Sequence, residues 1–413
     1  MTGRGVLTAA VLAVLAGCLC PPGTVAAQPA LAAGLSCPPL WVLWVQGTSE
    51  SSPSASEIVD TGMLGQLLGP VVAAAPNLLA RTYIPYSASF GGAVGTGGGT
   101  DPYVVSAGAG LAGLTDTAGR IAADCPNTAL AAVGYSQGAQ VVSSFAEAVG
   151  AGEGPIDPGR VAGIALFSDP QRAPGSPVIP GRPGQLTPDP APGTSGAAVS
   201  GVVISTAPAS GGGIATTSGA DYGALTGRVV DACVEGDLSC SAPDRAALLR
   251  IAAQLAAQAD LRDPVAALGS IQSLLSGTLG DAWTTVVNND FQIGRSSVDY
   301  VPAVSLAQRL TDAADSRTPA PGPADHAAAS ARWGQITAVV AADPITQLPN
   351  LAARLSVAWG QLVADNADLL DPAVLLRYTD LAGRHTSYAT GGQLASAIAW
   401  LTALAHDLAG SYQ

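Results

Sequence analysis

The stretch that decides the fold is residues 129–149, which read ALAAVGYSQGAQVVSSFAEAV. Its start, Ala129–Val133, is a short apolar run that predicts a buried β-strand, and Gln137–Val149 repeats apolar residues at helical spacing. Between the two stands GYSQG at 134–138. A G-x-S-x-G turn between strand and helix holds its serine in a strained conformation and exposes the hydroxyl. The five-residue pattern also occurs by chance, so its weight comes from the strand and helix around it.

The alternation of strand and helix continues outward from this stretch. Short apolar runs bounded by turn residues predict further strands at Trp41–Val45, Arg81–Ile84, Val161–Phe167 and Val229–Cys233. Helices are expected at Gly62–Leu79 and Val104–Ala123. Any single run could be a segment of buried helix instead, but the alternation as a whole is typical of a parallel sheet covered on both faces. The sequence therefore predicts an α/β fold.

Two segments interrupt the alternation. Residues 170–213 are rich in Pro, Gly, Ser and Ala, which predicts a long surface loop. Residues 243–380 are rich in Ala and Leu and predict a helical insertion, interrupted by a Pro-rich turn at 319–323, with amphipathic stretches at Arg245–Ala259, Asp263–Leu275 and Pro349–Val363. A last amphipathic helix, Gly392–Leu408, is expected to return to the main domain, which would comprise residues 37–240 and 381–413.

Composition limits the partners. The chain has 413 residues, 48% of them hydrophobic and 11% charged, which is enough for one large domain with a sizeable insertion. Its formal net charge of −13 repels phosphate backbones, and no basic cluster offsets it. Nucleic acid is therefore not expected as a partner, and the oligomeric state stays open.

Residues 1–27 have the pattern of a signal peptide, with a positively charged start, an apolar run at 6–19 and the small residues Val25–Ala27 as a cleavage site. The run is shorter than the roughly 20 residues that span a bilayer. LAGC at 15–18 also resembles a lipobox, in which Cys18 would carry a lipid and anchor the protein at the cell envelope. That alternative leaves Cys20 as an unpaired thiol, whereas simple secretion leaves an even number of cysteines, which suits an oxidising compartment. We expect a secreted protein.

A serine nucleophile needs a base, and the base needs an acid that orients it. The chain has three histidines. His406 lies within the last predicted helix, where a packed or surface role is expected, and His326 follows the Pro-rich turn, where it should be solvated. His385 lies in a predicted loop just before the closing helix, where hydrolases of this architecture present their base. We therefore predict Ser136 as nucleophile and His385 as base.

The best candidate for the acid is Asp237, between Cys233 and Cys240. A disulfide between these cysteines would close a small loop, worth roughly 2–3 kcal/mol by loop entropy, and would fix the direction of the carboxylate. A metal pair is the alternative, but the spacing is longer than in a zinc knuckle and no histidine lies nearby. Asp169 and Asp231, each near the end of a strand, remain rival acids.

Together these motifs resemble the cutinase family and its actinobacterial relatives, in the α/β-hydrolase superfamily. GYSQG follows a lead that contains Cys125-Pro126, and Cys37-Pro38 leads into a strand ending in QGT at 46–48, similar to the family's Arg-Gly-Thr. Residues 233–240 match the family's C-x-x-G-D-x-x-C, and residues 385–388 match its H-x-x-Y. The resemblance implies an α/β-hydrolase fold with Ser136, Asp237 and His385 as the triad.

The resemblance also implies an oxyanion hole from Thr48 and the Gln137 N–H, and a Cys37–Cys125 disulfide. The activity implied is hydrolysis of carboxylic esters through an acyl-enzyme, with no cofactor and no metal. Gln46 departs from the family's Arg, which puts any Arg-dependent support of the oxyanion loop in question.

The insertion is a second departure, because 144 residues (241–384) lie between Cys240 and His385, where family members have far fewer. If acid and base meet, both ends of the insertion lie beside the site, so we expect a helical cap that selects lipid or other apolar esters. A side domain packed elsewhere is the alternative. Rival functions are a thioesterase, a phospholipase, a mycolyl-type envelope esterase, or a non-catalytic envelope-binding protein on the same scaffold.

Overall fold

A computed structural model describes residues 37–97, 99–216 and 220–411. The elements given below all lie in one compact unit, Pro38–Gln413. The predicted signal peptide, with its lipobox alternative at Cys18, lies outside the described residues. Among the helices in the described ranges, none combines the length and the apolar character needed to span a bilayer.

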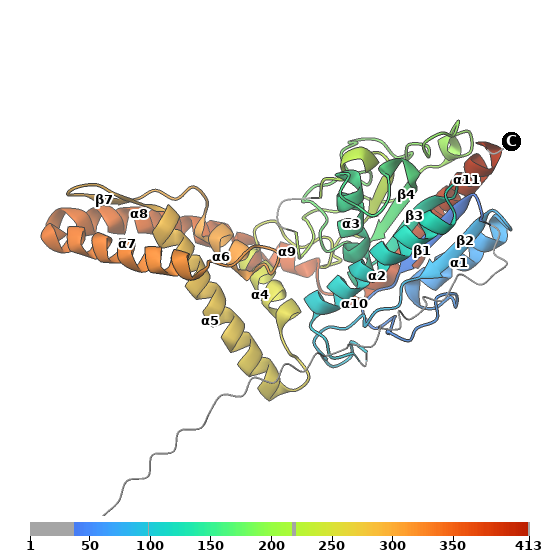
Figure 1. Cartoon of the computed structure of the whole chain (residues 1–413). Coiled ribbons are helices and arrows are strands. Elements are labelled where there is room, and N and C mark those ends of the chain that lie inside the picture. The colour runs from blue at the N-terminus through green and yellow to red at the C-terminus, as the bar shows by residue number, and fades with distance from the viewer. Residues whose placement is uncertain (1–36, 98, 217–219, 412–413) are drawn as a thin grey trace, which may run out of the picture. The chain divides into compact units, whose positions relative to one another are not determined.

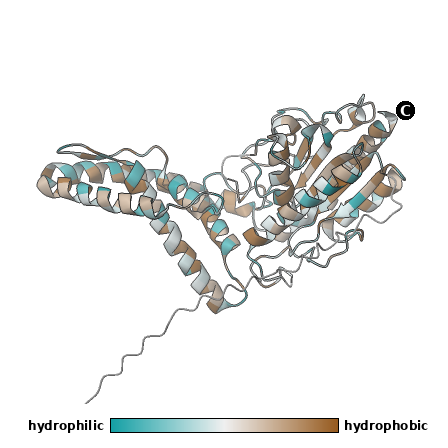
Figure 2. Cartoon of the chain, in the orientation of Figure 1, coloured by the Kyte–Doolittle hydropathy of each residue, from teal (hydrophilic) through white to brown (hydrophobic). Residues whose placement is uncertain are grey.

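The centre of the second unit is a five-stranded parallel sheet in the order β2-β1-β3-β4-β5 (Figure 1). Its strands are β1 Leu40–Val45, β2 Leu79–Tyr83, β3 Ala129–Tyr135, β4 Val161–Phe167 and β5 Val229–Ala232. Every residue of β1 and β4 is buried, and both strands read as continuous apolar runs, as expected of a sheet covered on both faces (Figure 2). The predicted α/β fold with a central parallel sheet is confirmed.

Helices cover both faces of the sheet. Leu40, Val42 and Trp44 of β1 share the main core with α1 (Gly62–Ala74) and α11 (Gln393–Ser411), which pack against each other. Alternate strand residues point to the opposite face. That face is covered by α2 (Tyr103–Asp124) and α3 (Gln137–Gly150), which also pack together. The closing helix therefore belongs to the main domain.

The first helix is shorter than its predicted range, Gly62–Leu79. It ends at Ala74, and β2 begins at Leu79. Pro76 lacks the N–H that a continued helix would need, and Asn77 adopts a left-handed conformation with φ of 65°. These two residues turn the chain into the edge strand.

Residues 170–213 contain little regular structure apart from the short 3-10 helix η2 (Val199–Gly201). Part of the segment is nevertheless packed: Ile179, Val199 and Ile204 are buried in the main core. The N–H groups of Ala198 and Val199 donate to the carboxylate of Asp407 on α11 over 2.8 and 3.0 Å. The segment is thus packed against the main domain by apolar contacts and by hydrogen bonds to α11.

The stretch 243–380 contains helices separated by short turns, together with an antiparallel hairpin that its Ala- and Leu-rich composition did not indicate. The hairpin pairs β6 (Phe291–Ile293) with β7 (Val298–Tyr300). The helices are α4 Ala247–Gln258, α5 Pro264–Asn289, α6 Leu306–Ala314, α7 Pro323–Ala342, α8 Pro344–Ala364 and α9 Pro372–Leu376. Phe291, Val298 and Tyr300 join Val287 of α5 and Ile336 of α7 in a small core separate from the main one.

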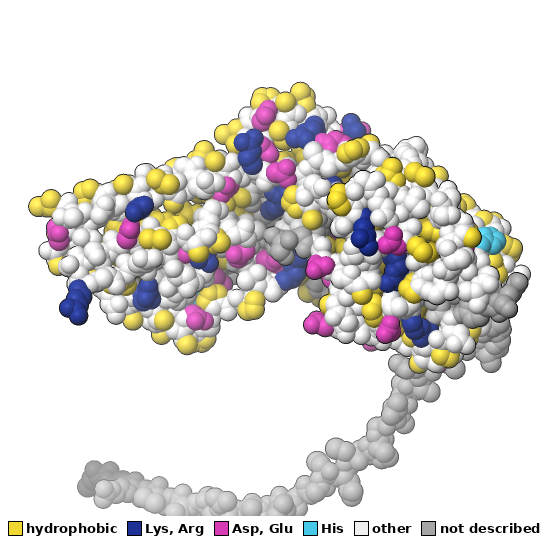
Figure 3. Space-filling model, turned by 90° about the horizontal axis from the view of Figure 1, so that it is seen from above, with side chains coloured by type: hydrophobic (Ala, Val, Ile, Leu, Met, Phe, Trp, Pro, Cys, Tyr) yellow, Lys and Arg dark blue, Asp and Glu magenta, His cyan; other side chains and the backbone are white. Residues whose placement is uncertain are grey.

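Helix α8 is mostly uncovered. Its only buried side chain is that of Gln347, and Trp359 is 64% exposed. Figure 3 shows apolar side chains interspersed with acidic and basic ones over one face of the protein. Val265, Ile345 and Val357 are also exposed, so part of the surface of these helices is apolar, in keeping with the low charged fraction of the chain.

Candidate active site

The site begins at the turn between β3 and α3, where Ser136 takes φ of 54° and ψ of −120°. Two glycines make this turn possible. A Cβ on Gly138 would lie 2.0 Å from the carbonyl oxygen of Val45, and one on Gly134 would lie 2.3 Å from the carbonyl oxygen of Gly138. Only glycine fits either position, and the close approach of strand and helix presents the Ser136 hydroxyl at the carboxyl end of β3.

The structure brings the three predicted triad residues together. His385 Nε2 lies 3.0 Å from Ser136 Oγ, and His385 Nδ1 lies 2.9 Å from Asp237 Oδ1. His385 belongs to the short helix α10 (Leu381–Thr386), so its predicted placement in a loop is wrong. The Asp380 side chain accepts from the Gly383 N–H over 3.0 Å, and this cap starts the helix one turn before the histidine.

The other two histidines lie elsewhere. His326 Nδ1 is 2.9 Å from Thr284 Oγ1 within the insertion, and its side chain is half exposed. His406 is exposed on α11.

Asp237 is 1% exposed and fully hydrogen-bonded. Its Oδ1 also accepts from the Ser239 N–H over 3.1 Å, and its Oδ2 accepts from the Tyr388 hydroxyl over 2.6 Å. Burial alone would raise the pKa of Asp237, but hydrogen bonds from His385, Ser168 and Tyr388 bring that pKa below its usual value. The carboxyl group is therefore ionised at neutral pH and suited to hold a histidine that gains a proton.

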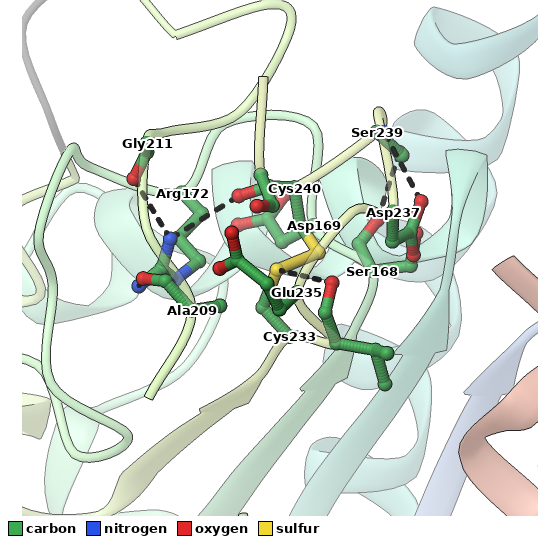
Figure 4. The surroundings of a disulfide bond; sticks show 12 residues. Ser168, Asp169, Arg172, Ala209, Gly211, Cys233, Glu235, Asp237, Ser239 and Cys240 are labelled. Atoms are coloured by element: carbon green, nitrogen blue, oxygen red, sulfur yellow. Dashed lines mark hydrogen bonds between the residues drawn. A yellow bond between two sulfur atoms is a disulfide. The ribbon is translucent and has the colours of Figure 1, made fainter. Parts of the chain in front are cut away.

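A disulfide between Cys233 and Cys240 joins the end of β5 to the far side of the Asp237 loop (Figure 4). The disulfide links the residues that flank the Asp237 loop. The loop is also bonded to the chain after β4, because the Ser239 side chain donates to the carbonyl of Ser168 over 3.1 Å. Cys37 and Cys125 are also disulfide-bonded cysteines. That these two pair with each other stays a prediction.

The rival acids, Asp169 and Asp231, make no hydrogen bond to His385 among the described residues. Both are buried, and each has one carboxylate oxygen without a partner. Burial raises the pKa of Asp231 to about 7 and raises that of Asp169 well above its usual value, with the mutual repulsion of the two carboxylates adding to Asp169. This environment favours a protonated carboxyl group, the opposite of what the orienting acid needs.

Two side chains with no assigned role in the sequence also hold the histidine. Ser168, directly after β4 and with φ of 60°, places Oγ 3.0 Å from His385 Nδ1. The Tyr135 hydroxyl donates to the main-chain carbonyl of His385 over 2.8 Å. No local sequence pattern indicates either role, because each contact joins residues more than 200 positions apart. Tyr388, by contrast, is indicated in the sequence by the H-x-x-Y spacing.

The proposed oxyanion groups are the Gln137 N–H and Thr48. Gln137 is the first residue of α3, where the backbone N–H groups and the helix dipole favour negative charge. Its side-chain amide donates to the carbonyls of Ser89 and Tyr103, each over 3.2 Å. These two bonds hold the turn between β3 and α3 in place. Thr48 lines the same cavity as Ser136 and His385.

The loop that carries Thr48 is tied to the start of α1. Gln46, where the family has arginine, donates through Nε2 to the carbonyl and the hydroxyl of Thr61 over 2.8 and 2.7 Å. The Glu50 carboxylate accepts from the N–H groups of Gly47 and Met63 over 3.0 and 2.8 Å. Support of this loop therefore comes from a neutral amide and a carboxylate, without an arginine at position 46.

A cavity of about 480 Å³ opens beside Ser136 and His385. Much of its wall is apolar, and includes Phe90, Leu111, Val141, Ile214 and Leu238. The insertion contributes only two parts of the wall: one face of α4, and residues 315–317 between α6 and α7. No group of His, Cys, Asp and Glu within the described ranges is arranged to hold a metal ion.

The family model for Cutinase matches residues 36–248, just over half of the chain. The chain belongs to the cutinase family. The matched range includes Ser136 and Asp237, whereas His385 and the helices of the insertion from α5 onward lie beyond it.

A curated relative, Cutinase CUT1 of Coprinopsis cinerea, is 32% identical over 145 residues, which are 33% of this cutinase-family chain and 60% of the relative. Among solved structures, the acetyl xylan esterase core of Trichoderma reesei is 20% identical, with 58% of this chain and 99% of that chain covered and a TM-score of 0.36. Lysin B of mycobacteriophage D29 is 17% identical, with 57% and 86% covered and a TM-score of 0.35. At scores this low, the structural likenesses add nothing to the family assignment.

Proposed function

We propose that this protein is a serine carboxylic ester hydrolase that acts on esters of apolar acyl groups. The observation that carries the proposal is the continuous line of contacts from Ser136 Oγ through His385 to Asp237, at 3.0 and 2.9 Å. A serine hydroxyl is a weak nucleophile until a base within hydrogen-bond reach can take its proton. The buried, ionised Asp237 orients that base and balances the charge it gains.

The reaction follows from this geometry. Ser136 Oγ attacks the carbonyl carbon of the ester while His385 Nε2 takes its proton, and the oxyanion is stabilised by the Gln137 N–H and Thr48. The alcohol leaves with the proton from His385, and an acyl group remains on Ser136. Water then attacks the acyl-enzyme, again with His385 as the base, and releases the acid.

The direct test uses Ser136→Ala and a fluorophosphonate probe, which labels an activated serine. The wild type should be labelled and should hydrolyse 4-nitrophenyl esters, whereas a folded Ser136→Ala variant should lose labelling and several orders of magnitude in rate. Labelling at a serine other than Ser136 would show that the nucleophile is wrong. An unlabelled wild type would favour a non-catalytic role.

The apolar wall of the cavity supports the substrate class, and the part supplied by α4 supports a cap role for that portion of the insertion. Ala257 of α4 lines the cavity, so Ala257→Trp should fill it. We expect this variant to keep hydrolysis of 4-nitrophenyl acetate and to lose that of 4-nitrophenyl palmitate. The matched control is Ala341→Trp on an exposed part of α7, which should change neither. Equal losses on both esters in Ala257→Trp would contradict the cap role.

We also propose that the protein is exported. The Cys233–Cys240 disulfide and the disulfide-bonded Cys37 and Cys125 support an oxidising compartment. Detection of the mature N-terminus in culture medium, near residue 28, tests this proposal.

A further inference from the structure

Ser168 has a backbone conformation that serine rarely adopts. It follows β4 directly, and its φ of 60° lies in the left-handed region that glycine enters without penalty. The conformation is held from both sides, because the Ser168 N–H donates to the Ala232 carbonyl over 3.1 Å and its carbonyl accepts from the Ser239 hydroxyl over 3.1 Å (Figure 4). Glycine would suit this backbone better than serine, so the backbone does not account for the hydroxyl group.

The position of residue 168 in the sheet places it beside all three members of the triad. Strand β4 lies between β3, which ends just before the nucleophile, and β5, which leads to the acid. The Ser136 N–H donates to the carbonyl of Phe167, the residue before Ser168, over 2.9 Å. Ser168 itself is fully buried, and the described residues that line the cavity do not include it. Its side chain can therefore act on the triad but not on the substrate.

The hydroxyl group of Ser168 lies where the base meets the acid. Its Oγ is 3.0 Å from His385 Nδ1, the same nitrogen that lies 2.9 Å from Asp237 Oδ1. Since Asp237 is ionised, Nδ1 carries a proton, and the Ser168 oxygen accepts from the same N–H that the carboxylate does. Burial raises the pKa of Asp237, and a hydrogen bond from the Ser168 hydroxyl is among the contacts that lower it. One hydroxyl thus bonds both the base and the acid.

We propose that Ser168 is a positioning residue that keeps the proton of His385 on Nδ1 and directs Nε2 at Ser136. The base can take the serine proton only through a ring nitrogen with a free lone pair, so the proton must stay on the other nitrogen. Asp237 binds Nδ1–H from one direction, and the Ser168 oxygen binds it from a second, which restricts rotation of the ring. This inference rests on the proposed function and adds a residue to it.

The experiment compares Ser168→Ala and Ser168→Gly with the wild type on 4-nitrophenyl acetate. Both variants lack the hydroxyl, and we expect kcat to fall about 10- to 100-fold in each, the effect of one hydrogen bond to a charged group. Acylation and deacylation both use His385, so they should slow together. KM should stay within about twofold of the wild-type value, as for an interaction that does not bind the substrate.

The two variants separate positioning from stability. Alanine keeps the unfavourable left-handed φ and glycine relieves it, so Ser168→Gly should unfold at a higher urea concentration than Ser168→Ala although the two share the same loss in kcat. The matched control is Ser143→Ala on α3. Ser143 is also fully buried, and its Oγ lies 2.9 Å from the Tyr222 hydroxyl. This control should lose stability and keep the wild-type kcat.

Four outcomes would overturn the inference: a wild-type kcat in both variants, a kcat recovered in Ser168→Gly alone, a change confined to KM, or an equal loss of kcat in Ser143→Ala. If the wild type hydrolyses the ester and is labelled at Ser136 by the fluorophosphonate, the proposed function stands in each of these cases. If the wild type does neither, the proposed function fails and this inference fails with it.

Discussion

Tyr388→Phe should reveal how strongly the fold and the triad depend on one hydroxyl group. Tyr388 is fully buried, its hydroxyl donates to Asp237 Oδ2 over 2.6 Å, and the Val234 N–H donates to that hydroxyl over 3.3 Å. The substitution removes one bond to a buried charge but leaves Asp237 its contacts with His385 and Ser239. A hydrogen bond to a charged group is worth about 1.5–3 kcal/mol, so the free energy of unfolding should fall by about that amount at neutral pH.

The effect should depend on pH in a defined direction. The pKa of Asp237 is lowered in the folded protein, so its stabilising contribution is present above the unfolded pKa and is lost as pH falls through the folded pKa. Without the tyrosine hydroxyl the folded pKa of Asp237 should rise, and the difference between wild type and variant should shrink on acidification.

Urea unfolding at about pH 7 and about pH 2.5, on either side of the ordinary aspartate pKa of about 3.9, measures this difference. Tyr378→Phe is the control, since the Tyr378 hydroxyl donates to the neutral carbonyl of Ser241 over 2.6 Å and its loss should not depend on pH in this range. A Tyr388→Phe variant as stable as the wild type at neutral pH, or a loss that is the same at both pH values, would refute the reasoning.

Three further predictions concern single side chains. His385→Ala should reduce ester hydrolysis as severely as Ser136→Ala, whereas His326→Ala should have little effect; the reverse outcome in steady-state assays would place the base in the insertion. Glu50→Gln should lower kcat more than it raises KM, because it replaces the carboxylate that accepts from Gly47 and Met63 with an amide that can accept from only one of them; an unchanged kcat would contradict this. Burial raises the pKa of Asp231 to about 7, so the folded state holds its proton more tightly than the unfolded state, and stability should fall as pH rises from about 4 to about 7. Asp231→Asn should make the free energy of unfolding, measured with urea, fall less over this pH range. An unaltered pH profile would contradict the raised pKa of Asp231.

The parts of the fold that the sequence predicts are those with local signals. Strands β1, β3 and β4 are uninterrupted apolar runs, and the glycines of the GYSQG turn report a backbone geometry that only they allow. The Cys233–Cys240 loop likewise carries its constraint within eight consecutive residues. These features depend little on the rest of the chain, so the periodicity and spacing of the sequence are sufficient to find them.

The features that the sequence does not predict depend on distant contacts. The hairpin β6–β7 forms because Phe291 and Tyr300 bury against helices α5 and α7, which a local apolar pattern does not reveal. Ser168 approaches His385 across 217 positions, and α4, which packs against α2, supplies part of the cavity wall. Composition marked the stretch 243–380 as helical, but it did not indicate which of its helices would face the site.

The insertion can separate acid from base in sequence without separating them in space because its two ends are joined. At the start of α4, Arg245 forms an ion pair with Asp368 over 2.8 Å, and the Asp368 N–H donates to the Arg245 carbonyl over 3.1 Å. Asn366 accepts from the Leu248 N–H over 2.7 Å beside this pair. Residues beyond this junction, including the separate core around Phe291, can therefore vary in length or packing without moving Asp237 or His385. Helix α4 does not have that freedom, because it lies at the junction and one of its faces lines the cavity beside Ser136. Substitutions in α4 and in residues 315–317 should therefore change which substrates the cavity accepts. Substitutions in the outer helices should change only the packing of those helices or their surface.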